Sequence, residues 1–412
     1  MDATAYYQLG QVFRPAAPVD ELRLFAGRKQ QLAAVIDAVT QPGRHAIIYG
    51  ERGVGKTSLA SIIREYLSSF GQGGVVAVKI TTDGTDDFSS IWHKVFGQLQ
   101  SVSTQQGLGF GAPKKSVAVP LSATLPEKVR PDDVRTLLVQ ASAKARIIVI
   151  IDEFDRAALH ASALIADTIK TLSDQATNAV VIIVGVADTV GTLIAEHESI
   201  ERALAQIQMP RMSDAELLEI VQRGFGEVGY TITAPAQNRI VQLSQGLPHY
   251  THLVALHSGR AAAKNDRNAI DMLDVAEGIQ TAVANTQESI RSLHHRAVMS
   301  PRRDNLYREV VLACALARTD SLGYFQASDV RDPLSIIVGR RFEIPAFSRH
   351  LSELCETQRG QMLTKIGSSR RFRYRFRNPL VQPFTIMDGL ASGNLDDKKL
   401  ETLRETHTVP AE

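Results

Sequence analysis

Eight residues have the types and the spacing of a phosphate-binding loop: Gly50-Glu51-Arg52-Gly53-Val54-Gly55-Lys56-Thr57. Glycines let the backbone fold tightly, so that several N–H groups converge on phosphate oxygens. Lysine adds positive charge and the threonine hydroxyl can bind Mg²⁺. An apolar strand pattern precedes the loop and an amphipathic helix pattern follows it, which makes a chance match improbable. We therefore expect ATP and Mg²⁺ as cofactors, with nucleotide contacts from Gly50, Gly53, Val54, Gly55, Lys56, Thr57 and Ser58.

An acidic pair, Asp152-Glu153, ends an apolar strand pattern roughly 100 residues after the loop, a plausible separation for paired motifs. Asp152 and Thr57 would hold Mg²⁺, and Glu153 would orient and activate the attacking water. The alternative is a polar strand end, because acidic residues commonly follow strands. Together with the loop, the pair predicts an ATP hydrolase.

These residues need a parallel sheet to position them, and the sequence predicts an α/β domain. Apolar strands alternate with helical patterns, which is typical of such a sheet. The continuously apolar run Ile147–Ile151 predicts a central strand covered on both faces. Residues 101–130 carry scattered glycines and prolines and predict a long surface loop or an inserted element. The predicted strands are His45–Tyr49, Gly74–Thr81, Arg146–Ile151, Ala179–Ala187 and Leu204–Met209.

After Met209 the pattern becomes purely helical, beginning at a capping box formed by Ser213 and Glu216. Further along, helices at Leu306–Ala317 and Pro345–Glu356 precede a hairpin of Gln361–Ile366 and Arg370–Arg377. That order is typical of a winged helix. The predicted domains are an N-terminal lead-in with an adenine-side segment (1–43), a nucleotide-binding domain (44–211), a helical lid (212–299), a winged helix (300–390) and a flexible tail (391–412).

Positive charge is concentrated in the predicted winged helix. Residues 301–390 hold 15 Lys and Arg against 9 Asp and Glu, whereas the whole chain has a net charge of only +2. Alternation with aromatic residues places the hairpin arginines on one face of a strand, where they could contact phosphates of double-stranded DNA. Alternatively, the arginines could protect an edge strand from aggregation or form a protein-binding surface. The DNA-contact candidates are Arg349, Arg371, Arg373, Arg375 and Arg377.

Composition favours a cytoplasmic protein that has no membrane association. Hydrophobic residues make up 44% of the chain, which is ordinary for a globular protein. The N-terminus has no signal-peptide pattern, and no apolar stretch is long enough for a membrane span. Two cysteines are too few for a disulfide framework.

Three motifs together resemble the AAA+ ATPases of the Orc1-like initiator group, which are neighbours of the signalling STAND ATPases. They are Leu24-Phe25-Ala26-Gly27-Arg28, Gly50–Thr57 and Ile151-Asp152-Glu153-Phe154-Asp155. The resemblance implies that Phe25 and Arg28 lie beside adenine. A Gly-Leu-Pro run is similar to that of STAND ATPases and implies an adenine contact from Pro248. His249 stands where initiators have a sensor arginine, which favours a slow nucleotide-gated switch.

The resemblance also implies two residues for hydrolysis. Asp188 falls at the position of a polar sensor of the γ-phosphate, although it could instead cap the following helix. Arg202 falls near the arginine finger that completes a neighbouring subunit's site, which would require a homo-oligomer. A surface ion pair is the alternative for Arg202, and Arg211 is a competing candidate for the finger.

Three functions remain open at this stage. The first is an oligomeric, ATP-dependent switch that engages DNA through a winged helix. The second is a STAND-like signalling or defence ATPase whose winged helix is regulatory and whose effector is a separate protein. The third is the ATPase subunit of a transposition system, which shares the DNA prediction and differs in its partners.

Overall fold

The computed structural model describes residues 3–69, 74–105, 115–143, 145–194, 200, 202–300, 305–368 and 371–408. Contacts divide the chain into two compact units. The sheet unit comprises Pro18–Glu51 and Gly55–Met209. The helical unit comprises Met1–Ala17, Arg52–Val54 and Pro210–Glu412. Among the described residues, no helix is long and apolar enough to cross a membrane.

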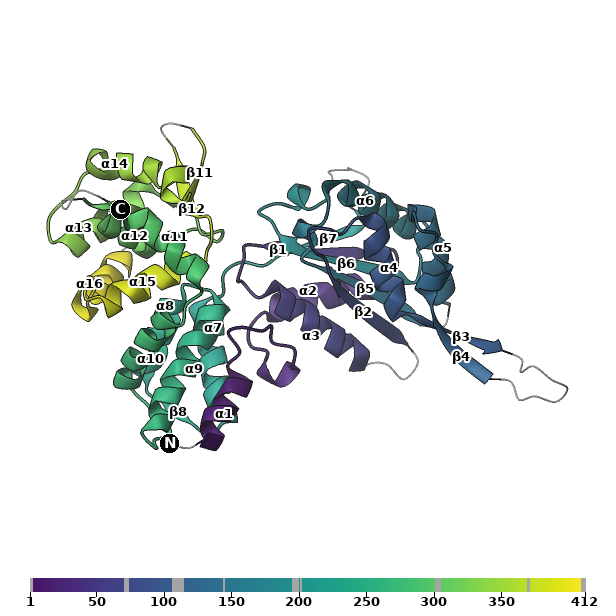
Figure 1. Ribbon diagram of the computed structural model, residues 1–412, viewed down its shortest axis with the longest axis horizontal. Helices are drawn as coiled ribbons and strands as arrows, with labels where there is room; N and C mark the ends of the chain where they lie inside the picture. Colours follow the sequence, from purple (N-terminus) through teal and green to yellow (C-terminus); the bar gives the residue numbers. More distant parts are fainter. Residues whose placement is uncertain are drawn as a thin grey trace. The chain divides into compact units, whose positions relative to one another are not determined.

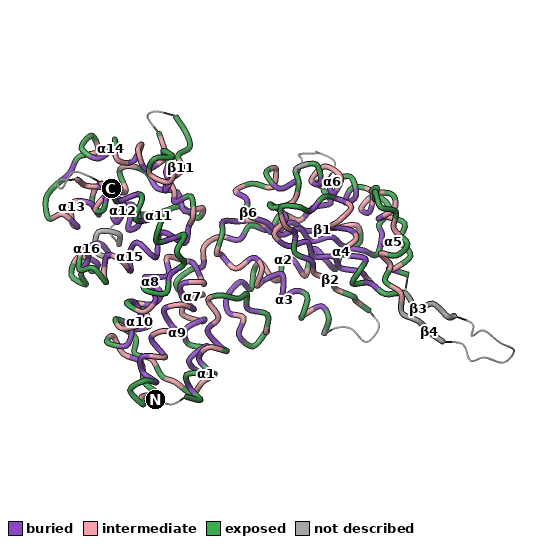
Figure 2. The backbone as a smooth tube through the Cα atoms, in the orientation of Figure 1, coloured by how far each residue is buried: buried purple, intermediate pink, exposed green. Residues whose placement is uncertain are grey.

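A five-stranded parallel sheet in the order β2-β5-β6-β1-β7 forms the centre of the sheet unit (Figure 1). The predicted α/β fold is therefore confirmed, and so is the central position of the strand that holds Ile147–Ile151. This strand and its neighbour β6 are buried along nearly their whole length (Figure 2). The strands are β1 (His45–Gly50), β2 (Val75–Thr81), β5 (Arg146–Asp152), β6 (Ala179–Val186) and β7 (Leu204–Gln208).

Helices cover the sheet because each strand alternates its side chains between two faces. Helices α2 and α3 contact the strands directly. A second cluster packs Trp92 and Phe96 of α4 with residues of α6 and with alternate strand residues such as Val149. The helices of this unit are α2 (Lys29–Thr40), α3 (Lys56–Ser69), α4 (Phe88–Gln98), α5 (Pro131–Ala141) and α6 (Leu159–Asp174).

The segment between α4 and α5 contains regular structure of its own. Strands β3 (Gln100–Gln105) and β4 (Lys115–Pro120) pair antiparallel in a two-stranded ribbon. A short 3-10 helix, Leu121–Thr124, leads from the ribbon towards α5. The described part of this segment is therefore a paired ribbon and not an irregular loop, and its being an insertion stays a prediction.

In the helical unit, α9 contacts each of α1, α7, α8 and α10. Ser213 caps α7 in the predicted capping box with Glu216. Helix α1 belongs to this unit, so the predicted lead-in of residues 1–43 is divided, and Phe13 after α1 packs on Phe225 at 4.7 Å between ring centroids. The helices are α1 (Ala3–Val12), α7 (Asp214–Glu227), α8 (Ala234–Ser244), α9 (Pro248–Lys264), α10 (Met272–Ala284) and α11 (Glu288–Val298). Strands β8 (Thr231–Ile232) and β9 (Ala269–Ile270) form a short parallel pair.

The C-terminal part of the helical unit combines helices with a three-stranded antiparallel sheet in the order β10-β12-β11. The two predicted helices and the predicted hairpin are present. The elements are α12 (Tyr307–Leu316), β10 (Phe325–Gln326), α13 (Ala327–Val338), α14 (Ile344–Glu353), β11 (Leu363–Ile366), β12 (Arg373–Phe376), α15 (Val381–Ala391) and α16 (Asp397–Thr408).

The prediction of a flexible tail over residues 391–412 is wrong for its described part. Helix α16 occupies Asp397–Thr408 and contacts α13. Its polar composition concealed two leucines, Leu400 and Leu403, which lie three residues apart on one helix face and are 2% and 3% exposed. Burial of these side chains holds the helix on the unit.

Candidate nucleotide site

The phosphate loop connects the end of β1 to the start of α3. Gly50 has a φ of 155°, and a Cβ at this position would collide with the carbonyl oxygen of Met209. Gly53 and Gly55 adopt φ values of 89° and 96°, which L side chains strongly disfavour. The backbone of the loop therefore requires glycine where the sequence has it. Helix α3 begins at Lys56, so its N-terminal N–H groups stand at the loop, where they favour an anion.

Lys56 is buried within the loop that it serves. Its Nζ donates to the carbonyl oxygens of Gly50 at 3.0 Å and of Glu51 at 2.8 Å, and the residue is 7% exposed. A desolvated ammonium group held beside the helix N-terminus concentrates positive charge at one point. This arrangement suits a phosphate group.

Asp152, the first residue of the acidic pair, lies beside the phosphate loop. Asp152 ends β5 and is 1% exposed. Its Oδ1 accepts from the Thr57 hydroxyl at 3.4 Å and from the Glu153 backbone N–H at 2.9 Å. A hydroxyl and a carboxylate converging at the end of a parallel strand form an oxygen donor set that suits Mg²⁺.

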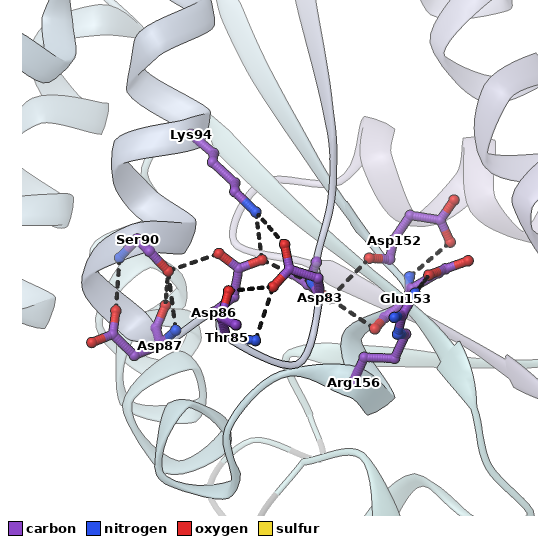
Figure 3. A network of polar contacts seen from close by, with 10 residues as sticks. Asp83, Thr85, Asp86, Asp87, Ser90, Lys94, Asp152, Glu153 and Arg156 are labelled. Carbon is purple, nitrogen blue, oxygen red and sulfur yellow. Dashed lines mark hydrogen bonds and ion pairs between the residues drawn. The ribbon is translucent and has the colours of Figure 1, made fainter.

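Glu153 follows with a φ of 55°, a left-handed conformation that is uncommon for a residue other than glycine. Thr82 fixes this backbone, because its hydroxyl donates to the carbonyl oxygens of Asp152 at 3.1 Å and of Glu153 at 2.7 Å. The Glu153 carboxylate accepts from Arg156 Nη1 at 2.8 Å (Figure 3). Both side chains of this ion pair are substantially exposed, at 42% and 56%.

The loop after β2 carries further acidic residues beside this pair (Figure 3). Lys94 of α4 donates to Asp86 at 2.5 Å and to Asp83 at 3.3 Å. Hydrogen bonds from the Thr85 side chain and backbone, followed by Lys94, lower the pKa of Asp83 to about 2. Asp87 caps α4. These carboxylates are thus engaged in local structure, and the described residues contain no cluster of three or more His, Cys, Asp or Glu side chains that could hold a metal ion.

Three residues at this site were missed by the sequence prediction: Lys79, Thr82 and Arg156. Lys79 of β2 places its Nζ 3.0 Å from Asp152 Oδ2. A signal for it was present, because Lys79 interrupts an otherwise apolar strand run. Thr82 and Arg156 had no comparable signal, since threonine and arginine are common after strands.

The predicted adenine-side residues belong to two different units. Phe25 is half-buried, and Arg28 is buried at the N-terminus of α2 with a φ of 57°. The preceding segment is held on α3, where the Ser58 hydroxyl accepts from the Val19 N–H at 3.1 Å. Pro248, the first residue of α9, lies in the helical unit. The adenine contacts of these residues stay predictions.

His249 follows Pro248 and donates from Nδ1 to the carbonyl oxygen of Pro15 at 2.8 Å. Burial lowers the pKa of this histidine, although the hydrogen bond opposes the shift. His249 is therefore engaged with the segment after α1. Its relation to the sensor arginine of initiators stays a prediction.

The residues predicted for γ-phosphate sensing and for the finger lie near the ends of β6 and β7. Asp188 is half-buried in the turn after β6, and the cap residue of the following 3-10 helix is Thr189 rather than Asp188. Arg202 is exposed in the turn before β7. Arg211, the competing candidate, donates to Gln382 at 2.7 Å and to the carbonyl oxygen of Gln245 at 3.2 Å within the helical unit. The catalytic roles of Asp188 and Arg202 stay predictions.

The basic hairpin has the predicted alternation. Tyr374 and Phe376 are buried against Phe325, whereas Arg373 is exposed and Arg375 is half-buried. Arg373 pairs with Asp320 at 3.2 Å. The guanidinium carbons of Arg373 and Arg375 lie 5.3 and 4.7 Å from the centre of the Tyr324 ring.

The other three DNA-contact candidates are exposed. Arg349 pairs with Glu353 at 2.7 Å, and Arg377 donates to Gln361. Arg371 lies just before β12, outside the strand itself. The structure thus confirms an arginine-bearing face on β12, and DNA contact stays a prediction.

Comparison with known proteins gives one family. The model of the novel STAND NTPase 1 family matches residues 17–321, a stretch that includes the phosphate loop and the acidic pair. No curated protein matches the chain. The match confirms the predicted relationship to the P-loop ATPases of the STAND group.

Solved structures show similarity of fold. A Walker-type ATPase of Pyrococcus abyssi is 14% identical with a TM-score of 0.49, and the match covers 90% of this chain and 98% of that chain. The ORC2 protein of Aeropyrum pernix, in ADPNP–ADP complexes, is 14% identical with a TM-score of 0.49 and coverages of 93% and 98%. The RuvB Holliday junction branch migration motor of Thermotoga maritima is 16% identical with a TM-score of 0.44 and coverages of 87% and 95%. At these identities the similarity concerns the fold alone.

Proposed function

The chain belongs to the novel STAND NTPase 1 family, and from this premise we propose that it is an ATP-dependent molecular switch with slow hydrolysis. Membership establishes a nucleotide-binding NTPase. ATP as the nucleotide, slow turnover, oligomeric assembly and the output of the switch are parts of the proposal.

The joint placement of Lys56, Thr57 and Asp152 carries the proposal. A triphosphate with Mg²⁺ fits these residues, because the loop carries the buried Lys56 ammonium and leads into the N-terminus of α3, and because the Thr57 hydroxyl and the Asp152 carboxylate converge. Lys56 and the N–H groups of the loop would bind the phosphates, and Thr57 and Asp152 would hold the metal. Mg²⁺, when bound, supplies neutralisation of phosphate charge.

Glu153 would accept a proton from an attacking water, a role supported by its position directly after Asp152. In this structure one carboxylate oxygen of Glu153 forms an ion pair with Arg156. A base that must first exchange an ion pair for water is a poor base, which supports slow, regulated turnover.

A binding experiment tests the nucleotide site. We expect Lys56→Ala to weaken ATP binding by about a hundredfold or more, because a buried charge-assisted contact to phosphate is lost. Lys170→Ala removes an exposed lysine of the same unit and is the matched control. Retained ATP affinity in Lys56→Ala would refute the proposed site.

Oligomeric assembly follows if Arg202 acts on a neighbouring subunit. In that case a mixture of Arg202→Ala and Glu153→Gln proteins should recover turnover that neither has alone, because one subunit type retains the base and the other retains the finger. Absence of rescue at any mixing ratio would count against Arg202. Substitution of Asp188, which lies at the proposed γ-phosphate sensing position, should lower turnover more than it weakens ATP binding.

For the output, two functions compete. The helices α12 to α14 and the sheet β10-β12-β11 support a winged helix, and the arginine face of β12 favours a second function, engagement of double-stranded DNA. The contacts of Arg373 and Arg375 with Tyr324 and Asp320 favour the alternative, a regulatory module of a signalling or defence ATPase that acts on a separate effector protein. The ATPase subunit of a transposition system is the variant of the DNA function.

Salt dependence separates these outputs. If the hairpin binds DNA, Arg373→Ala/Arg375→Ala should weaken binding and reduce the slope of log affinity against log salt by about 2, since two phosphate contacts are lost. Arg291→Ala/Arg296→Ala removes the same charge from exposed positions of α11 and is the control. DNA binding that is equal in both double variants would favour the regulatory function.

A further inference from the structure

Lys79 is a charged residue in the middle of a parallel strand, a position where burial of a charged side chain costs free energy. It lies on β2 opposite Ile150 of β5, and its side chain is 12% exposed. Taking an ammonium group out of water costs free energy unless close partners compensate. The partners of Lys79 therefore indicate why this strand contains a lysine.

Both partners belong to the nucleotide site. The Nζ of Lys79 lies 3.0 Å from Asp152 Oδ2 and donates to the Ser61 hydroxyl at 3.0 Å. Ser61 lies four residues after Thr57 on α3, so the two hydroxyls share one helix face. Lys79 thus connects the metal-ligand candidate on β5 to the helix that carries the other candidate.

The two carboxylate oxygens of Asp152 have different neighbours. Oδ1 faces the Thr57 hydroxyl and the Glu153 N–H, whereas Oδ2 faces Lys79. An ion pair at one oxygen favours the orientation of the carboxylate in which the other oxygen faces Thr57. Residues behind a metal ligand commonly orient it in this way, and their loss typically costs about 10- to 100-fold in metal affinity.

We propose that Lys79 is a positioning residue that orients Asp152 for Mg²⁺, so that a cationic donor at this position increases the strengthening of ATP binding by Mg²⁺. The inference rests on the proposed ATP site and adds a residue to it. Two physical effects of removing Lys79 oppose each other. Loss of orientation weakens metal binding, whereas loss of repulsion between two cations strengthens it.

The measured quantity is the Mg²⁺ enhancement, defined as the ratio of ATP affinity in Mg²⁺ to ATP affinity in EDTA. In Lys79→Met we expect this ratio to fall by about tenfold while the affinity in EDTA is unchanged, because the phosphate loop is intact. Lys79→Arg, which keeps a cationic donor, should retain most of the ratio. Lys94→Met removes another lysine paired with carboxylates of the same unit and should leave the ratio unchanged.

A double-mutant cycle shows whether Lys79 acts through Asp152. In an Asp152→Asn background, Lys79→Met should not lower the ratio further. If Lys79→Met alone does not fold, the comparison of Asp152→Asn with the double variant still tests the inference, because the double variant leaves no unpaired buried charge. Folding is followed by the fluorescence of Trp92, the single tryptophan of the chain and a buried residue of the sheet unit.

Several results would overturn the inference. An unchanged or increased ratio in Lys79→Met would show that repulsion or simple charge balance is the main effect. A further fall in the Asp152→Asn background would show that Lys79 acts elsewhere. Wild-type protein that does not bind ATP refutes the proposed function and the inference together, whereas wild-type binding with an unaffected ratio in Lys79→Met refutes the inference alone.

Discussion

The sheet unit and the helical unit organise their buried polar groups differently. In the sheet unit, Lys56, Thr57 and Asp152 come from the end of one strand and the start of one helix, around a loop whose shape glycine dictates. In the helical unit, buried polar side chains connect helices and helix ends directly to one another. Tyr250 Oη donates to the carbonyl oxygen of Leu380 at 2.5 Å, and Gln382 accepts from Arg211.

Mutations in the two units should therefore have different effects. A polar change in the sheet unit at the motif should alter chemistry at little cost to the fold, because the backbone of the loop positions the site. A polar change at the buried contacts of the helical unit should alter stability instead, because there the side chains themselves connect the helices. The predictions below test this contrast.

The largest expected effect concerns the base. Glu153→Gln should reduce ATP turnover by about 10²- to 10⁴-fold while preserving ATP binding and thermal stability, because only the proton acceptor is lost. Steady-state turnover and ATP affinity check it. Glu219→Gln in the helical unit, which removes a carboxylate paired with Arg223, should leave turnover within about twofold. Equal losses in the two variants would contradict the contrast between the units.

Acid should destabilise both units through buried histidines, among them His45 in the sheet unit and His252 in the helical unit. Burial, with a contribution from Arg146, lowers the pKa of His45 to about 4, and burial lowers the pKa of His252 to about 4. The unfolded chain takes up these protons near pH 6.5, so each histidine's stabilising contribution is complete above that pH. As the pH falls towards 4, about 3 kcal/mol per histidine is lost.

Trp92 fluorescence separates the two histidines, since it reports on the sheet unit. Denaturant unfolding followed by this signal should depend less on pH in His45→Asn, by up to about 1.4 kcal/mol per pH unit between pH 6.5 and 4. Asparagine can still accept from the Val181 N–H, which His45 Nδ1 accepts at 3.0 Å. His160→Asn, at an exposed position, is the control. An unchanged pH dependence in His45→Asn would show that His45 is not the group responsible.

Sequence alone predicted the sheet unit well because its elements follow local rules. The run Ile147–Ile151 could only be a covered strand, and the loop motif fixed the start of α3 at Lys56. The sequence predicted those site residues that lie at or just after the end of a strand. Lys79 was missed because its importance depends on Asp152 and Ser61, which only the folded sheet places beside it.

The helical unit was predicted less completely, since its signals are tertiary. Gln382 reads as an ordinary polar residue, yet it is 1% exposed and donates to the carbonyl oxygen of Ala315 at 3.0 Å. The polar sequence of α16 predicted a flexible tail because, among the side chains of this helix that the structure describes, Leu400 and Leu403 are the buried ones. Local pattern rules use the spacing of residues along the sequence. These contacts depend instead on which helices pack against one another in the folded chain.

A moderate effect should follow when that polar contact is removed. Gln382→Leu should lower the free energy of unfolding by about 1–3 kcal/mol, because Arg211 loses an acceptor and Ala315 a donor in a buried place. Thermal unfolding checks it, with ATP affinity expected to be unchanged. Gln280→Leu, at an exposed position of α10, is the control. If both variants unfold at the wild-type temperature, buried contacts of this kind do not hold the helical unit together.

The smallest expected effect lies at the ion pair that occupies the base. Arg156→Gln should raise ATP turnover by about two- to threefold at saturating ATP, because Glu153 no longer exchanges an ion pair for water and exposed pairs contribute less than about 1 kcal/mol. Arg135→Gln breaks an exposed pair of the same i,i+3 spacing with Asp132 and should leave turnover unchanged. High salt should reduce the difference between wild type and Arg156→Gln, since screening weakens the same pair. A fall in turnover would mean that Arg156 assists the reaction, and that the pair does not restrain the base.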